Sequence, residues 1–176
     1  MILKVIQLKI EEFSLGRLRT NCYILKKDNK CIIIDPGDEA QKIKEACKGY
    51  EVEEILVTHH HWDHILALEE LENFYQLKHN TFLRKTFNYE IVETPGHASD
   101  SLTFYFKEER TMFTGDFLFY HTIGRCDLET SSIEEMKKSL DKISKYPDDI
   151  KIYPGHGKSS ILGEEKKYFC QYISLL

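Results

Sequence analysis

The sequence lacks any long apolar run, since no purely apolar stretch is longer than the four residues of Cys31 to Ile34. A membrane-spanning helix needs about 20 such residues, so no span is expected. Residues 1–10 are interrupted by lysines and carry no small-residue cleavage site, so a signal peptide is not expected either. We therefore predict a soluble, cytoplasmic protein that does not act at a membrane.

Cysteine pairs and an excess of basic charge are also missing. The five cysteines never form a C-x-x-C spacing, which argues against a disulfide framework and a thiolate zinc site and fits a reducing cytoplasm. Lys and Arg total 24 against 29 Asp and Glu, for a net charge of −5. Nucleic acid is therefore not an expected partner, because binding to its phosphates needs a basic surface.

What is present fits one compact domain. The chain has 176 residues, of which 41% are hydrophobic, and it contains no repeat or linker, so we predict a single domain over residues 1–176. Apolar periodicity and turn residues predict a mixed α/β protein rather than an all-parallel sheet. The expected strands are 3–10, 21–26, 31–35, 55–57, 89–93, 101–106, 111–114 and 150–153, and the expected helices are about 38–48, 63–75, 132–146 and a closing helix, 164–176.

Two helix starts have a recognisable signal. Asp38 with Gln41, and Ser132 with Glu135, each have the spacing of a capping box. In a capping box the first side chain accepts a hydrogen bond from the backbone N–H three residues later. We therefore predict that these residues begin the first and third helices.

The most informative segment is Thr58–His64, which reads THHHWDH directly after an expected strand. Imidazole and carboxylate groups are ligands suited to zinc, iron or manganese. The other interpretation, a histidine-rich surface loop, stays open from this segment alone. The candidate ligands in it are His59, His61, Asp63 and His64.

Three more ligand-type residues follow strand-like segments in turns that contain glycine. His97 lies in TPGH, Asp116 in TGD and His156 in PGHG. Glycine and proline in such turns let the backbone bring ligands close together. Seven candidate ligands exceed one tetrahedral site but suit two metals that share a carboxylate.

In this order the motifs resemble the metallo-β-lactamase superfamily, and within it the glyoxalase II (hydroxyacylglutathione hydrolase) branch in a short form. The segments NCY at Asn21, IDPG at Ile34 and GRCDL at Gly124 also match that branch. The resemblance implies a four-layer αββα sandwich. It also implies two divalent metal ions, zinc by preference and iron or manganese otherwise. One metal would be held by His59, His61 and His97, the other by Asp63, His64 and His156, with Asp116 as the bridge.

The implied reaction is hydrolysis of an acyl bond, a thioester above all, by a water that the metals activate. Asp63 and Asp116 would be catalytic residues. The expected partner is a small-molecule substrate, and the protein is expected to be a monomer or a small homo-oligomer. Asp35 either orients a ligand or forms the turn before Pro36. Tyr120 lines the pocket or packs internally, and Arg125 binds an anionic substrate or pairs with Asp127. His60, His79 and His121 are expected outside the ligand set.

Two departures limit the substrate assignment. Asp100 stands where the family often has glycine, and only 20 residues follow His156, whereas full glyoxalase II enzymes add a helical glutathione-binding domain. Three alternatives stay open: a persulfide dioxygenase-like oxidoreductase with one iron, a lactonase or phosphodiesterase, and a metal-binding module without turnover.

Overall fold

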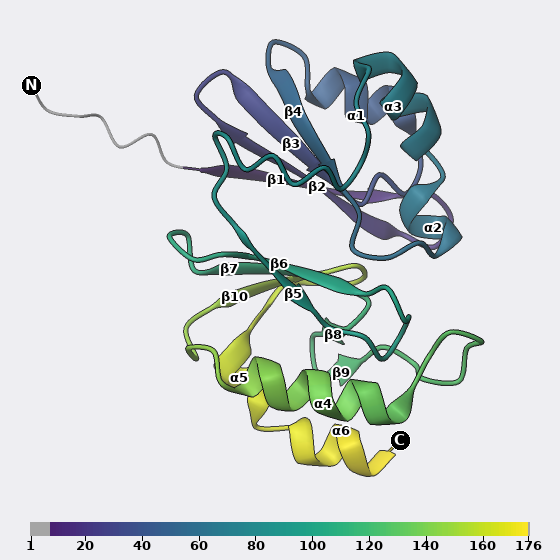
Figure 1. Ribbon diagram of the computed structural model, residues 1–176, viewed down its shortest axis with the longest axis vertical. Helices are drawn as coiled ribbons and strands as arrows, with labels where there is room; N and C mark the ends of the chain where they lie inside the picture. The colour runs from purple at the N-terminus through teal and green to yellow at the C-terminus, as the bar shows by residue number, and fades with distance from the viewer. Residues whose placement is uncertain (1–7, 176) are drawn as a thin grey trace, which may run out of the picture. The chain divides into compact units, whose positions relative to one another are not determined.

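A computed structural model describes residues 8–175, which form two compact units (Figure 1). Unit 1 contains residues 8–57 and 62–88, and unit 2 contains residues 58–61 and 89–175. Each unit combines one main sheet with helices, so the predicted mixed α/β class is confirmed. The assignment of the whole chain to a single domain stays a prediction.

Unit 1 is built on a four-stranded sheet in the order β1-β2-β3-β4. The first three strands are antiparallel neighbours along the chain. The fourth pairs with β3 in parallel, because a helix connects the two strands. The strands are β1 (Lys9–Leu15), β2 (Thr20–Lys27), β3 (Lys30–Ile34) and β4 (Glu51–Leu56).

Three helices belong to unit 1: α1 (Ala40–Ala46), α2 (Trp62–Ile65) and α3 (Leu68–Tyr75). Their apolar residues share one buried core with the sheet. Burying such side chains contributes about 1.5–3 kcal/mol each before conformational entropy is counted. Representative members of this core are Cys22, Ile24, Ile33, Ile43, Ile55 and Leu71.

Three predictions in unit 1 need correction. The expected helix 63–75 is two helices, with a break at residues 66–67. The expected capping box at Asp38 is wrong, because α1 begins after Glu39, which is left-handed and makes no side-chain cap bond. The expected first strand at 3–10 overlaps β1 only at its end. Residues 3–7 of that prediction lie outside the described residues.

Unit 2 is built on a five-stranded sheet in the order β11-β10-β7-β6-β5. The central pair, β7 and β10, is parallel, and the remaining pairs are antiparallel. A separate two-stranded hairpin follows β7, which the sequence did not predict because each strand has only two residues. The strands are β5 (Glu90–Glu93), β6 (Leu102–Phe106), β7 (Thr111–Gly115), β8 (Leu118–Phe119), β9 (Thr122–Ile123), β10 (Lys151–Pro154) and β11 (Ser160–Ile161).

The helices of unit 2 are α4 (Ile133–Ser144), α5 (Leu162–Lys166) and α6 (Phe169–Leu175). The Ser132 side chain accepts a hydrogen bond from the backbone N–H of Glu135, so the predicted start of α4 is confirmed. The expected closing helix is two short helices, and residue 176 lies outside the described residues. Met136, Leu140 and Ile143 of α4 pack in a buried core with residues of the sheet.

Within residues 8–175, no helix combines the length and the apolar character that crossing a membrane would require.

Candidate metal centre

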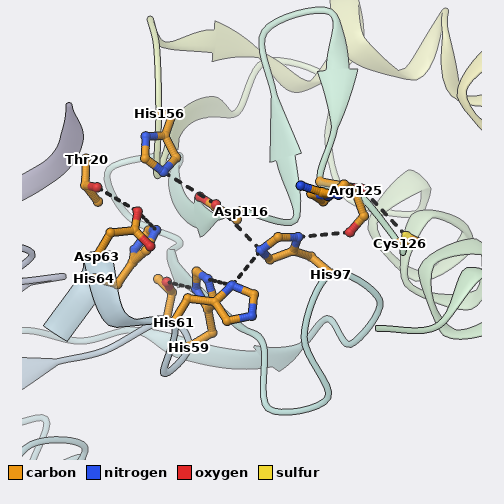
Figure 2. Close-up of polar contacts among 12 residues, drawn as sticks. Thr20, His59, His61, Asp63, His64, His97, Asp116, Arg125, Cys126 and His156 are labelled. Carbon is orange, nitrogen blue, oxygen red and sulfur yellow. Dashed lines mark hydrogen bonds and ion pairs between the residues drawn. The ribbon is translucent and has the colours of Figure 1, made fainter. Parts of the chain in front are cut away.

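Unit 2 brings three of the predicted ligands together: His59, His61 and His97 (Figure 2). The Nε2 atom of His59 lies 3.1 Å from Nδ1 of His61, and Nε2 of His97 lies 2.8 Å from the same atom. The three rings meet edge to face, with centroids 4.6 to 5.2 Å apart. Nitrogen ligands about 2.0–2.1 Å from one zinc ion require this kind of close convergence.

Hydrogen bonds to the outer nitrogens decide which ring atoms can bind a cation. Nδ1 of His97 lies 3.0 Å from the backbone oxygen of Arg125. A carbonyl oxygen only accepts, so Nδ1 carries the proton and Nε2 presents its lone pair to the other histidines. Nδ1 of His59 likewise contacts the hydroxyl of Thr58 at 3.1 Å. The donor set of this cluster therefore fits a divalent cation.

Asp116 lies beside this cluster at the end of β7. Its Oδ2 atom is 3.6 Å from Nε2 of His97 and 3.5 Å from Nε2 of His156 (Figure 2). One carboxylate oxygen thus lies close to two imidazoles, those of His97 and His156, which come from different segments of unit 2. The carboxylate could therefore contact a cation bound by either imidazole.

Two glycines allow this close approach. Gly115 adopts a φ of +49°, and a Cβ atom there would lie 2.3 Å from Oγ1 of Thr58. A Cβ atom on Gly124 would lie 1.9 Å from the backbone oxygen of Asp116 and 2.8 Å from Cβ of His97. Any larger residue at either position would push the segments that carry the ligands apart.

Unit 1 holds the remaining two predicted ligands, Asp63 and His64, on α2. Nδ1 of His64 lies 3.0 Å from Oδ2 of Asp35, and both side chains are buried. Because the carboxylate accepts this bond, the lone pair of His64 is on Nε2, which lies 3.7 Å from Oδ2 of Asp63. Of the two roles left open for Asp35, this contact favours orientation of His64.

Asp63 has a second partner that sequence reasoning missed. The hydroxyl of Thr20, at the start of β2, donates a hydrogen bond of 2.8 Å to Oδ2 of Asp63. Thr20 lies 43 positions before Asp63, and nothing in a run of strand-forming residues marks it as a partner. Its contact holds the Asp63 carboxylate in place.

The other candidate residues lie outside the ligand clusters. The Arg125 guanidinium forms an exposed two-pronged ion pair with the Asp127 carboxylate, at 2.5 and 2.7 Å, which is one of the two roles predicted for it. His60 is exposed and pairs with Asp100 at 2.6 Å, as its expected outward orientation requires. Tyr120 is 41% exposed in the turn between β8 and β9.

Comparison with known proteins identifies the family. The sequence profile of the metallo-beta-lactamase superfamily matches residues 15–81 and 74–156. This chain is a member of the metallo-beta-lactamase superfamily. A probable metallo-hydrolase of Streptococcus pyogenes is 30% identical, over 83% of this chain and 82% of its own. The hydroxyacylglutathione hydrolase of Francisella tularensis subsp. novicida is 32% identical, over 82% of this chain and 65% of its own.

Solved structures agree with this membership. BLEG-1, a B3 metallo-beta-lactamase, is similar with a TM-score of 0.84 and 25% identity, over 90% of this chain and 97% of that chain. TTHA1623, solved in a di-iron-bound form, is similar with a TM-score of 0.80 and 26% identity, over 88% and 96% of the two chains. The metallo-β-lactamase fold that the sequence motifs predict is therefore confirmed.

Proposed function

We propose that this protein is a metal-dependent hydrolase whose dinuclear site cleaves an acyl bond. The position of the Asp116 carboxylate carries the proposal, because one of its oxygens lies within 3.6 Å of Nε2 atoms of both His97 and His156. A carboxylate in that position suits two cations better than one. Membership in the superfamily supports the same conclusion.

The donor set suits two divalent cations that are neither strongly hard nor strongly soft. Imidazole nitrogens and carboxylate oxygens accept zinc, iron or manganese, and zinc is our first choice. The di-iron-bound form of the similar TTHA1623 supports a dinuclear site and keeps iron as a strong alternative. When bound, such cations would lower the pKa of a water and polarise the carbonyl of the substrate.

We propose separate roles for the residues of this site in binding the cations and in positioning the attacking water. His59, His61 and His97 would hold one cation, and Asp63, His64 and His156 the other, as the family resemblance implies. Asp63 is proposed to accept a hydrogen bond from the attacking water, with the Thr20 hydroxyl holding its carboxylate in place. Asp35 and the Arg125 carbonyl fix the ring tautomers of His64 and His97, so that lone pairs face the cations.

A thioester is the proposed substrate, and a small molecule the proposed partner. The similarity to a hydroxyacylglutathione hydrolase supports the thioester. This chain spans only 65% of that enzyme's length, so the glutathione moiety is not part of the proposal.

The metal content of the purified protein, followed by assays on thioesters, lactones and phosphodiesters, tests the proposal. We expect about two metal ions per chain and turnover of a thioester. Asp116→Ala should remove at least one metal and reduce thioester turnover by 100-fold or more. Asp149→Ala is the matched control, because Asp149 is an exposed carboxylate of the same unit that pairs with Arg110. Thioester turnover that survives Asp116→Ala would refute the dinuclear mechanism.

The three-histidine cluster also suits a mononuclear iron site, which keeps a persulfide dioxygenase-like activity as the second candidate. Metal stoichiometry and oxygen uptake separate the two functions. One iron per chain, with oxygen consumed on a persulfide and no thioester turnover, would replace the hydrolase proposal.

A further inference from the structure

A lysine and a tyrosine that lie close to candidate ligands in the sequence contact each other in unit 2. Lys158 follows His156 by two residues, and Tyr120 lies four residues after Asp116. The Nζ atom of Lys158 lies 3.7 Å from the centroid of the Tyr120 ring. Strands β8 and β10, which precede these two residues, contact each other in unit 2. The ring of Phe119, the chain neighbour of Tyr120, has its centroid 6.3 Å from that of the candidate ligand His156, so the Tyr120–Lys158 pair follows segments that meet near His156.

The charge of Lys158 is available to a ligand. Several other cations of unit 2 are paired with carboxylates, such as Lys166 with Asp148 and Lys167 with Glu164. Among residues 8–175, no carboxylate forms an ion pair with Lys158, whose contact is the face of an aromatic ring. An ammonium group on a ring face keeps N–H donors directed away from the ring.

The turn that carries Tyr120 is anchored through a backbone hydrogen bond. His121 is left-handed, with a φ of 56°, and its ring stacks on Tyr120 with centroids 3.9 Å apart. The backbone N–H of His121 donates to Oε2 of Glu165 at 2.9 Å, and Glu165 is completely buried. A fixed tyrosine holds the ammonium group in position, so less side-chain entropy is lost when an anion binds.

We propose that the Tyr120–Lys158 pair binds a carboxylate of the substrate, a few bonds away from the acyl bond that is cleaved. The Lys158 ammonium would supply the charge, and the exposed Tyr120 hydroxyl would donate a second hydrogen bond. The inference rests on the proposed hydrolase function and narrows its substrates to acyl compounds with an anionic substituent. That carboxylate belongs to either the acyl or the thiol side of the thioester.

Three matched thioesters test this selectivity: butyryl-N-acetylcysteamine, succinyl-N-acetylcysteamine and S-butyryl-3-mercaptopropionate. The first is neutral, the second has a carboxylate on the acyl side, and the third has one on the thiol side. We expect one of the two anionic compounds to exceed the neutral one in kcat/KM by about fivefold, the upper end for a partly exposed ion pair. Lys158→Met should abolish this ratio, and Lys158→Arg should restore it. Lys167→Met, at an exposed lysine of the same unit, should leave the ratio unchanged.

A binding measurement separates this inference from the hydrolase proposal. Acetylation of Lys158 by an active ester, followed by mass spectrometry, should slow in the presence of succinamate and not of neutral butyramide. Lys167 serves as the internal reference. Protection of Lys158 without any thioester turnover would refute the hydrolase and support the pair as an anion site. Turnover with no preference for anionic substrates, together with no protection, would overturn the anion site and leave the hydrolase standing.

Discussion

The imidazole of His64 and the carboxylate of Asp35 form a buried pair, with Nδ1 and Oδ2 3.0 Å apart. Asp35 directly follows β3, and its backbone N–H donates a hydrogen bond to the oxygen of Leu56, the last residue of the neighbouring β4. The sheet therefore fixes the carboxylate, the carboxylate fixes the ring, and the ring presents Nε2. A local feature of strand pairing thus determines the orientation of a candidate metal ligand.

Asp35→Asn should weaken metal binding at the position that His64 serves. The neutral amide accepts the Nδ1 proton less strongly, so the ring loses part of its orientation and basicity. We expect a loss of about 10–100-fold in metal affinity, measured by competition with a chelator. Asp28→Asn is the matched control, since Asp28 is an exposed aspartate of the same sheet with a similar φ of 55° against 52°. Equal affinities for the two variants would contradict the orienting role.

Gly115→Ala should destabilise unit 2. The left-handed φ of 49° costs an alanine about 1–2 kcal/mol, and the contact with Thr58 adds about 1–3 kcal/mol. Chemical denaturation measures the sum. Gly49→Ala also places an alanine at a positive φ, of 85°, but without the contact, because nothing lies within 4 Å of a Cβ atom there. If the two variants lose the same free energy of unfolding, the close approach of Thr58 and Gly115 is wrong.

Local signals in the sequence were sufficient to predict the protein family and most of the helices and strands. The strand-forming residues of 101–106 and the Ser132–Glu135 spacing depend on neighbours within a few positions, and both the strand and the helix start that they predict are confirmed. The reciprocal bond of a capping box does not form at Ser132, because its backbone N–H donates to the oxygen of Gly96 instead. Tertiary contacts of this kind have no signature in a local window.

Long-range partners could not be predicted for the same reason. Thr20 reads as a strand residue, and only the position of α2 makes it a partner of Asp63. Glu165 reads as part of a solvated Glu/Lys helix face, yet it is completely buried among three donors. Two of these donors, His121 and Ser160, lie before α5 in the chain, so periodicity within the helix alone does not reveal the burial.

The stability of unit 1 should depend on pH through Glu72. Burial raises the pKa of this carboxyl, but hydrogen bonds from the backbone and ring of His79 and from Lys78 outweigh it and lower the pKa to about 2. Because the folded pKa is below the ordinary 4.5, the stabilisation is complete above pH 4.5 and is lost as the pH falls towards 2. Glu72→Gln should flatten the unfolding free energy in that window. Glu45→Gln, at an exposed glutamate of the same unit, should not change the profile.

Glu165→Gln should destabilise unit 2 and loosen the turn that carries Tyr120. The buried carboxylate accepts hydrogen bonds from the hydroxyls of Ser160 and Tyr172 and from the His121 backbone. An amide offers one acceptor oxygen in place of two, so at least one buried donor loses its partner at a cost of about 1–3 kcal/mol. Denaturant unfolding and amide exchange at His121 measure the two effects. Glu164→Gln, which removes only an exposed ion pair, should cost less than about 1 kcal/mol. Similar losses for both variants would show that the carboxylate is not the anchor of this turn.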